Sequence, residues 1–203
     1  MASDVDICNL ALARLGDEAT ISSLDPPEGS AQAYHCARFY PIARDTLLEA
    51  HDWSFATTRR ALAELSDATP PAGWLYAYSR PTGAVRLLAC LEAEAPDDSD
   101  PQPFTTEALT DGTRVIYSNT QDAVMRYTIR VIDPAVFPPL FVDALSLLLA
   151  SHLAGPLLKG TAGVQMSRAM GSAFAGVLAM AKTSDANQRR QDTTHTPAWI
   201  ASR

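Results

Sequence analysis

The pattern of hydrophobic and polar positions changes its period at Trp53, and no turn residue marks the change. Upstream, apolar and polar residues recur at helical spacing, which predicts a half-buried helix. Its apolar side carries Ala43, Leu47, Leu48, Ala50 and His51, and its polar side carries Arg44, Asp45, Glu49 and Asp52. Downstream the period is two, which predicts a strand with Trp53 and Phe55 on one face. We expect both rings to be buried where the helix meets the strand.

Helical patterns also begin the chain. Ser3 or Asp4 can cap a first helix that Gly16 ends, because these residues satisfy backbone groups that a helix end leaves unpaired. Ser30 can cap a second helix, which passes Pro41 and continues to the change of period. These two helices make the first half of a predicted bundle.

Two further helices are predicted after the middle of the chain. One, over residues 140–154, is apolar on most of its circumference, so neighbouring elements must cover it on several sides. Gly155-Pro156 predicts its end, and the last helix is expected over residues 162–182. Small residues form a row at i+4 spacing on that last helix: Ser167, Gly171, Ala175 and Ala179. The row fits either the core of an ordinary helix hairpin or close packing against a neighbouring subunit.

The middle of the chain consists of short strand patterns separated by turn residues. Trp74, Tyr76 and Tyr78 form an alternating aromatic row, which is typical of a packed sheet face. Residues 110–113, Thr-Asp-Gly-Thr, predict a hairpin turn, since Asp-Gly supplies the positive backbone angles that such turns require. A last strand is expected over residues 123–132.

Together these elements predict an α+β fold, in which an antiparallel bundle of about four helices carries an inserted small antiparallel β subdomain and an extended C-terminal tail. The expected divisions are N-terminal bundle helices at 1–52, the β-rich insertion at 53–133, C-terminal bundle helices at 134–182 and the tail at 183–203. This arrangement places the strands between two pairs of helices.

The predicted tail is polar up to Pro197 and then offers Trp199, Ile200 and Arg203. We interpret it as a docking peptide for a partner, because a polar segment cannot bury itself and the Trp-Ile pair is its concentrated apolar area. Arg203 can add a carboxylate pair at the rim of that contact. Packing of the tail onto its own domain is the alternative.

Composition narrows the classes of function. The chain has 203 residues, 47% of them hydrophobic, which is enough for one globular core with an inserted subdomain. Its formal net charge of −7 argues against a sequence-independent nucleic-acid binder, because such proteins displace counterions with clustered cationic side chains. Three widely spaced cysteines indicate neither a disulfide framework nor a metal site. No secretory signal is predicted, and the apolar run 136–158 contains three prolines, Asp143 and His152, so we expect a buried helix and no membrane.

No motif predicts a catalytic, cofactor-binding or metal site. Residues 155–161 differ from a phosphate-binding loop, because Lys159 precedes the second glycine of the run. His51 and Asp52 are neighbours near a helix end, where capping or exposure explains them better than general-base chemistry. We therefore expect no cofactor and no enzymatic activity.

Three groups of residues carry a family resemblance. They are Arg44-Asp45 with Leu47-Leu48, His51, Trp53, Phe55-Ala56 and Arg59; Ile7, Cys8, Asn9, Leu10, Ala11 and Leu12 with Arg14, Leu15 and Gly16; and Trp74, Tyr76, Ala77 and Tyr78 followed by a proline. Together they resemble the tail tubular protein A family, the head-to-tail adaptor (connector) proteins of tailed bacteriophages. We expect Arg44, Trp53, Phe55 and Trp74 at the structural junction.

The resemblance implies a structural virion protein and no enzyme. A family adaptor forms a ring, commonly a dodecamer, under the phage portal protein and carries the tail nozzle or neck protein on its other side. DNA leaves through the lumen without specific binding, and an acidic chain can line such a channel without gripping phosphates. The implied location is the neck of the virion, after synthesis in the host cytoplasm. The alternative, from another class, is a small α+β enzyme or ligand-binding domain that uses the face of Trp74, Tyr76 and Tyr78.

Overall fold

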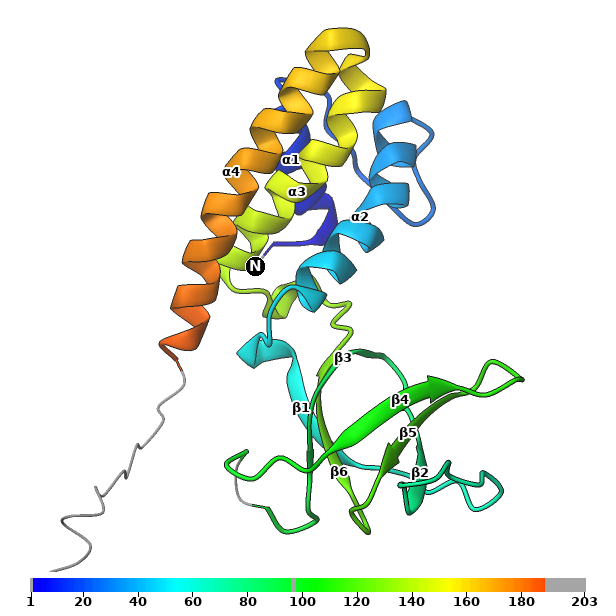
Figure 1. The fold of residues 1–203 in the computed structure, drawn as a ribbon. Coiled ribbons are helices and arrows are strands. Elements are labelled where there is room, and N and C mark those ends of the chain that lie inside the picture. The colour runs from blue at the N-terminus through cyan, green and yellow to red at the C-terminus, as the bar shows by residue number, and fades with distance from the viewer. Residues whose placement is uncertain (1, 96–97, 189–203) are drawn as a thin grey trace, which may run out of the picture.

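The computed structural model of this chain describes residues 2–95 and 98–188 and shows an α+β fold with helices and strands in separate bodies (Figure 1). Four α-helices make one end of the described molecule, and two antiparallel sheets make the other. The strands are inserted between the second and third helices, so the chain leaves the bundle and returns to it. The predicted fold class is confirmed.

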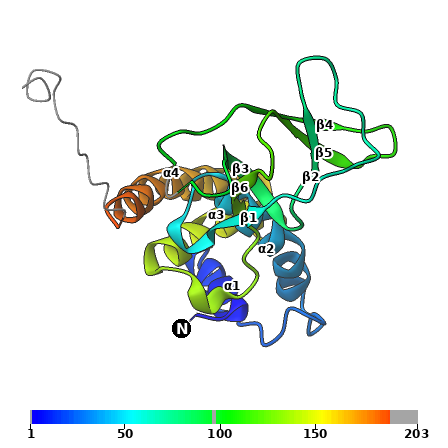
Figure 2. The same ribbon diagram turned by 90° about the horizontal axis from the view of Figure 1, so that it is seen from below.

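The bundle is built around α3, Pro139–Leu158, which α1 (Asp4–Arg14), α2 (Ala31–Glu49) and α4 (Gly160–Ala186) surround (Figures 1 and 2). Leu145, Leu149 and Leu153 of α3 are fully buried, together with residues from every other helix. By length and composition α3 could also cross a membrane, but 56% of its apolar window is buried inside the protein. That burial is typical of the core helix of a bundle.

The first two helices begin where the sequence predicts. The Ser3 hydroxyl accepts a hydrogen bond from the backbone N–H of Asp6 at 3.0 Å, and the Asp6 carboxylate accepts one from the Ser3 N–H at 2.9 Å. This reciprocal pair is a capping box, and it satisfies two donors that the helix leaves open. At the start of α2, the Ser30 hydroxyl accepts a hydrogen bond from the backbone N–H of Ala33, which is one of the two bonds of such a box.

The end of α3 predicted at Gly155-Pro156 is wrong. The helix continues to Leu158 although Pro156 has no N–H to donate to the carbonyl one turn back. The extensive packing of α3 against α4 offsets that lost hydrogen bond. The chain instead breaks at Lys159 and Gly160, which both adopt positive φ angles and turn it directly into α4.

The strands form two sheets that close on each other. β1 (Thr57–Ala61), β6 (Val124–Ile129) and β3 (Ala84–Leu91) make one sheet, and β2 (Tyr76–Ser79), β5 (Arg114–Ser118) and β4 (Phe104–Ala108) make the other. Isolated bridges join Glu64 to Tyr78 and Cys90 to Gln102, so each edge of one sheet meets an edge of the other. Closure of this kind protects strand edges that would otherwise be open to pairing. The predicted turn at residues 110–113 joins β4 to β5, and Gly112 has the expected positive φ of 85°.

The junction between α2 and β1 buries Trp53 as predicted, but the prediction that Phe55 is buried there is only partly met, and neither ring lies in a strand. Residues Ser54–Ala56 form a 3₁₀ turn, and the strand begins only at Thr57. Trp53 is 1% exposed, and its indole N–H donates to the carbonyl of Leu47 at 2.7 Å, which ties the ring back to α2. Phe55 is half-buried and stacks edge-on against Phe141 of α3, with ring centroids 5.0 Å apart.

We expect the Trp53→Ala substitution to lower the free energy of unfolding by about 3 to 5 kcal/mol, because it removes a buried ring and leaves a cavity. Chemical denaturation followed by circular dichroism measures the loss. Tyr34→Ala is the control, since Tyr34 is 59% exposed on the outside of α2 and a surface substitution changes stability by about 0.5 kcal/mol or less. Equal denaturation midpoints for the two variants would contradict the junction described here.

Candidate functional site

Arg44, predicted on the polar side of its helix, is instead 8% exposed. Its guanidinium donates to one carboxylate oxygen of Asp45, with Nε at 2.9 Å and the nearer terminal nitrogen at 2.8 Å. The other oxygen of Asp45 accepts from Nε of Arg130, just after β6, at 2.9 Å. Asp45 thus neutralises a buried arginine and links the bundle to the sheets, which is a structural role.

Trp74 does not join Trp53 and Phe55 at the junction. It lies before β2, where it packs with Ala77, Val115 and Tyr117 in a small cluster of its own. Tyr76 and Tyr78 contact a different cluster, between the two sheets. The predicted aromatic row is interrupted because the regular strand starts only at Tyr76.

A buried carboxylate at the end of α4 holds the bundle to the start of the β-rich segment. Asp185 is 5% exposed, and its Oδ1 accepts from the backbone N–H of Ser54 at 2.9 Å and from the Ser54 hydroxyl at 2.6 Å. Its Oδ2 lies 3.1 Å from Nε2 of His51. Ser54 and His51 both bond to the carboxylate and not to each other, so this is no nucleophile-and-base pair.

No local pattern predicts the Asp185 contacts, because the partners are more than 130 residues apart in the sequence. The contacts also explain why α4 runs to Ala186, past the predicted end at residue 182. The first residues of the predicted tail are therefore the last turn of a helix. Trp199, Ile200 and Arg203, the predicted docking residues, lie outside the described residues.

The predicted row of small residues on α4 turns from the interior to the surface along the helix. Ser167 and Gly171 are half-buried, and the Ser167 hydroxyl donates to the carbonyl of Ser151 on α3 at 2.8 Å. Ala175 and Ala179 are exposed. The first half of the row thus belongs to the α3–α4 hairpin, and the second half points out of the bundle.

That outward side, which we call the outer face of α4, is apolar and uncovered. Residues 169–181 contain no charged side chain, although α4 packs chiefly on α3 and so has one side buried. The outer face consists of Ser172, Ala173, Ala175, Gly176, Ala179 and Met180, all exposed. A surface helix of a monomer normally carries charged residues on such a face, so this one is suited to contact another helix at short distance.

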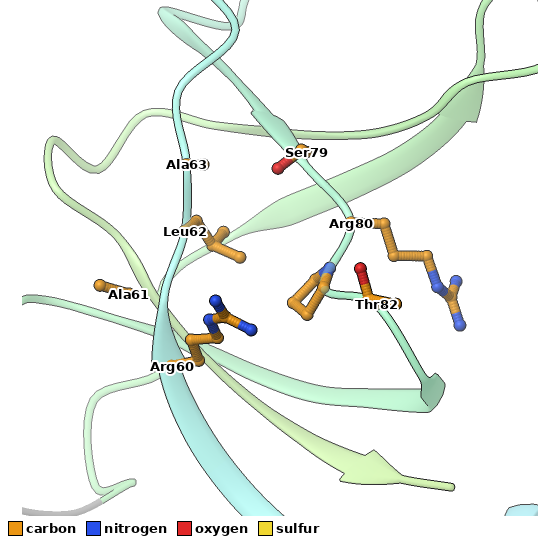
Figure 3. Close-up of a pocket in the computed structure, with 8 residues that line it drawn as sticks. Arg60, Ala61, Leu62, Ala63, Ser79, Arg80 and Thr82 are labelled. Atoms are coloured by element: carbon orange, nitrogen blue, oxygen red, sulfur yellow. The ribbon is translucent and has the colours of Figure 1, made fainter.

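A basic pocket of about 270 Å³ lies where the continuation of β1 separates from the end of β2 (Figure 3). Arg60 reaches into the space between the strands, whereas Arg80 turns away and donates to the carbonyls of Ala84 and Val85, both at 3.0 Å. Burial, and then the charge of Arg114, lower the pKa of Arg80. Arg60, together with Ser79 and Thr82, can therefore hold an anion there, and the lining includes no carboxylate to act as a base.

A second pocket, of about 420 Å³, lies between the start of α1, the middle of α2 and Ile132. It combines an apolar wall with the side chains of Asp4, Tyr40 and Arg44. We call it the α1–α2 pocket. Across residues 2–95 and 98–188, no group of histidine, cysteine and carboxylate side chains is arranged to hold a metal ion.

We expect Asp185→Ala to lower the free energy of unfolding by about 2 to 3 kcal/mol, because Ser54 and His51 lose a charged acceptor in a buried place. Amide exchange should also speed up selectively in the last turn of α4, which hydrogen exchange read by mass spectrometry measures. Asp67→Ala, at an exposed turn, is the control. Unchanged protection of the last turn would show that Asp185 does not anchor it.

Comparison of the chain with known protein families and with curated proteins found no match. Among the described residues, the fold presents three surfaces suited to binding: the outer face of α4, the basic pocket between β1 and β2, and the α1–α2 pocket.

Proposed function

We propose that this chain is a structural virion protein, a head-to-tail adaptor whose copies form a ring between the portal and the tail nozzle or neck of a tailed phage. The ring, a dodecamer in this proposal, contributes part of the channel through which DNA leaves. The proposal rests on the resemblance of the motifs around Arg44, Trp53 and Tyr76 to the tail tubular protein A family, and on one feature of the fold.

That feature is the outer face of α4. The exposed, uncharged face over residues 169–181 is costly to leave in water, and soluble monomers seldom keep a large apolar face exposed. Alanine and glycine side chains let a second helix approach closely, and interaxial distance depends on the side chains at the contact. A flat helix face repeated on every copy suits a subunit–subunit contact.

The charge of the chain supports the channel part of the proposal. At −7 the protein repels phosphates at long range. Several of its arginines also form salt bridges. Asp98 pairs with Arg59 and Arg126, and Asp45 pairs with Arg44 and Arg130. A channel lined by such a surface would let DNA pass through without binding its phosphates tightly.

The alternative, an enzyme or ligand-binding domain on the aromatic face, gains little from the geometry. Tyr78 is 1% exposed, and its hydroxyl donates to the carbonyl of Thr120 at 2.7 Å. Trp74 packs in another cluster. The three rings do not share a surface that a ligand could cover, so no observation favours this reading over the adaptor.

We expect the isolated chain to be a monomer or weak oligomer that forms a ring when a portal ring templates it. Light scattering with and without portal, followed by negative-stain microscopy, measures the change. Ala175→Glu should weaken ring formation about tenfold or more, because it places a charge in an apolar contact. Ala31→Glu, an exposed alanine on α2, should leave it intact. If the protein remains monomeric in the presence of the portal, the proposal is wrong.

We also expect the ring to bind duplex DNA only weakly and with strong salt dependence, because the acidic surface repels phosphates. A gel-shift titration at physiological salt tests this. Binding at micromolar concentration or below would contradict the proposal that DNA passes through the lumen without being held. It would not contradict the proposed ring.

A further inference from the structure

The basic pocket between β1 and β2 is lined by polar side chains that the rest of the fold does not use. Arg60 reaches into it from β1, and the Ser79 hydroxyl faces it from the end of β2 (Figure 3). Thr82 adds a second hydroxyl to the lining. Across residues 2–95 and 98–188, these three side chains form no hydrogen bond or ion pair, so their donors are available to a ligand.

A backbone donor faces the same side of β1. The N–H of Leu62 donates to the carbonyl of Ala123, on the side of β6, at 2.8 Å. Hydrogen-bonded and non-hydrogen-bonded residues alternate along an antiparallel pair. The N–H of Ala61 therefore points away from β6, toward the side on which the pocket lies, because β1 is an edge strand of its sheet.

The fold does not neutralise the positive charge around this pocket. Six described arginines pair with carboxylates: Arg14, Arg44, Arg59, Arg86, Arg126 and Arg130. Within the described residues, Arg60, Arg80 and Arg114 form no ion pair, and the N–H of Arg80 donates to the carbonyl of Arg114 at 3.2 Å. Burial and then the charge of Arg114 lower the pKa of Arg80, and the charge of Glu49 raises it by less. An anion is therefore attracted to this corner of an otherwise acidic chain.

The shape of the pocket favours the end of a ligand over a chain that passes through it. The pocket is closed on one side where the strands pair, since the N–H of Ser79 donates to the carbonyl of Ala63 at 2.9 Å. Its volume of about 270 Å³ is below the roughly 300 to 1,000 Å³ of pockets that enclose whole drug-sized molecules. A guanidinium, two hydroxyls and a backbone N–H around such a space suit an oxyanion with several oxygens.

We propose that this pocket binds the terminal phosphate of a phosphate monoester. Arg60 donates two hydrogen bonds to its oxygens, and Ser79, Thr82 and the N–H of Ala61 donate to the oxygens that remain. A phosphate diester, as in the backbone of DNA, carries one negative charge and continues on both sides, so it fits neither the charge nor the closed end. The proposal concerns the β-rich insertion alone and does not rest on the adaptor function.

A structural role explains only part of this arrangement. An inward-facing charge at the edge of a sheet prevents pairing with another chain, and Arg60 lies two residues before the buried Leu62, on the same face of the strand. That role requires neither the free hydroxyls of Ser79 and Thr82 nor the nearby Arg80. It also predicts no affinity for phosphate, so the two roles can be told apart.

A nuclear magnetic resonance titration of the full chain at constant ionic strength tests the proposal. At pH 8, above its second pKa of about 6, methyl phosphate carries two negative charges. We expect it to shift the backbone amide signals of Ala61, Ser79 and Thr82 until the site is saturated. Dimethyl phosphate and acetate should bind more weakly by about tenfold or more, because each has one charge fewer and offers fewer free oxygens.

Matched variants show whether the pocket is responsible. Arg60→Gln should raise the dissociation constant for methyl phosphate about tenfold or more, because it removes a charge and a two-pronged donor. Ser79→Ala removes a hydroxyl and no charge, and should raise that constant about threefold. Arg38→Gln is the control, since Arg38 is exposed on α2, outside the pocket, and forms no ion pair within the described residues. Amide signals far from the pocket report whether each variant is folded.

The proposal is wrong if methyl phosphate causes no saturable shift, or if the shifts gather at other residues. It is also wrong if dimethyl phosphate or acetate binds as tightly as methyl phosphate, or if Arg60→Gln and Arg38→Gln have equal affinities for it. None of these results bears on ring formation at a portal, so the adaptor proposal is judged separately.

Discussion

The structure depends first on covering α3. This helix is apolar on nearly every side, so it is stable in water only when other helices surround it. α1 and α2 cover it from one half of the chain, and α4 covers it from the other. Because helices from both ends of the chain cover α3, the strands from the middle of the chain form an insertion between α2 and α3. It also leaves each covering helix with a side that faces away from the core, and on α4 that side is the uncharged one.

Two carboxylates fix how the inserted strands sit on the bundle. Asp185, nearly buried, accepts from Ser54 and lies against His51 at the start of the insertion. Asp45 pairs with Arg130 at its end, where the chain returns toward α3. Each contact joins one residue of the bundle to one at a boundary of the insertion, and the two boundaries are far apart in sequence. Hydrogen bonds to charged groups are stronger than neutral ones. The nearly buried Asp185 contacts therefore hold their boundary more firmly than the half-exposed Arg130 pair holds the other.

The parts of the fold that could be predicted from sequence are those with a local cause. Capping by Ser3 and Ser30, the Asp-Gly hairpin turn and the apolar circumference of α3 each depend on residues close together in the chain, and each was predicted correctly. The burial of Arg44 was missed because it depends on Asp45 and on where Arg130 arrives from β6.

Long-range contacts explain the other misses. Trp74 packs apart from Tyr76 and Tyr78 because regular pairing with β5 starts only at Tyr76. Alternating aromatic residues predict a strand but do not predict the residue at which it begins to pair. Helix α4 extends past its predicted end because Asp185 in its last turn is held by partners that lie far away in the sequence. Among the described residues, the buried hydroxyl of Tyr40 has no hydrogen-bond partner, and the sequence could not show this, since only tertiary packing reveals which buried donors lack an acceptor.

The distribution of charge bears on the assembly that we propose. Bodies that each carry negative charge repel one another, so an uncharged helix face can bring two copies together only if something offsets that repulsion. A templating ring would offset the repulsion by supplying a high local concentration of copies. If the chain has the function that we propose, it would stay dispersed after synthesis and assemble where a template gathers its copies. The same acidic charge that delays assembly in solution would then face a DNA channel, where repulsion from phosphate is an advantage.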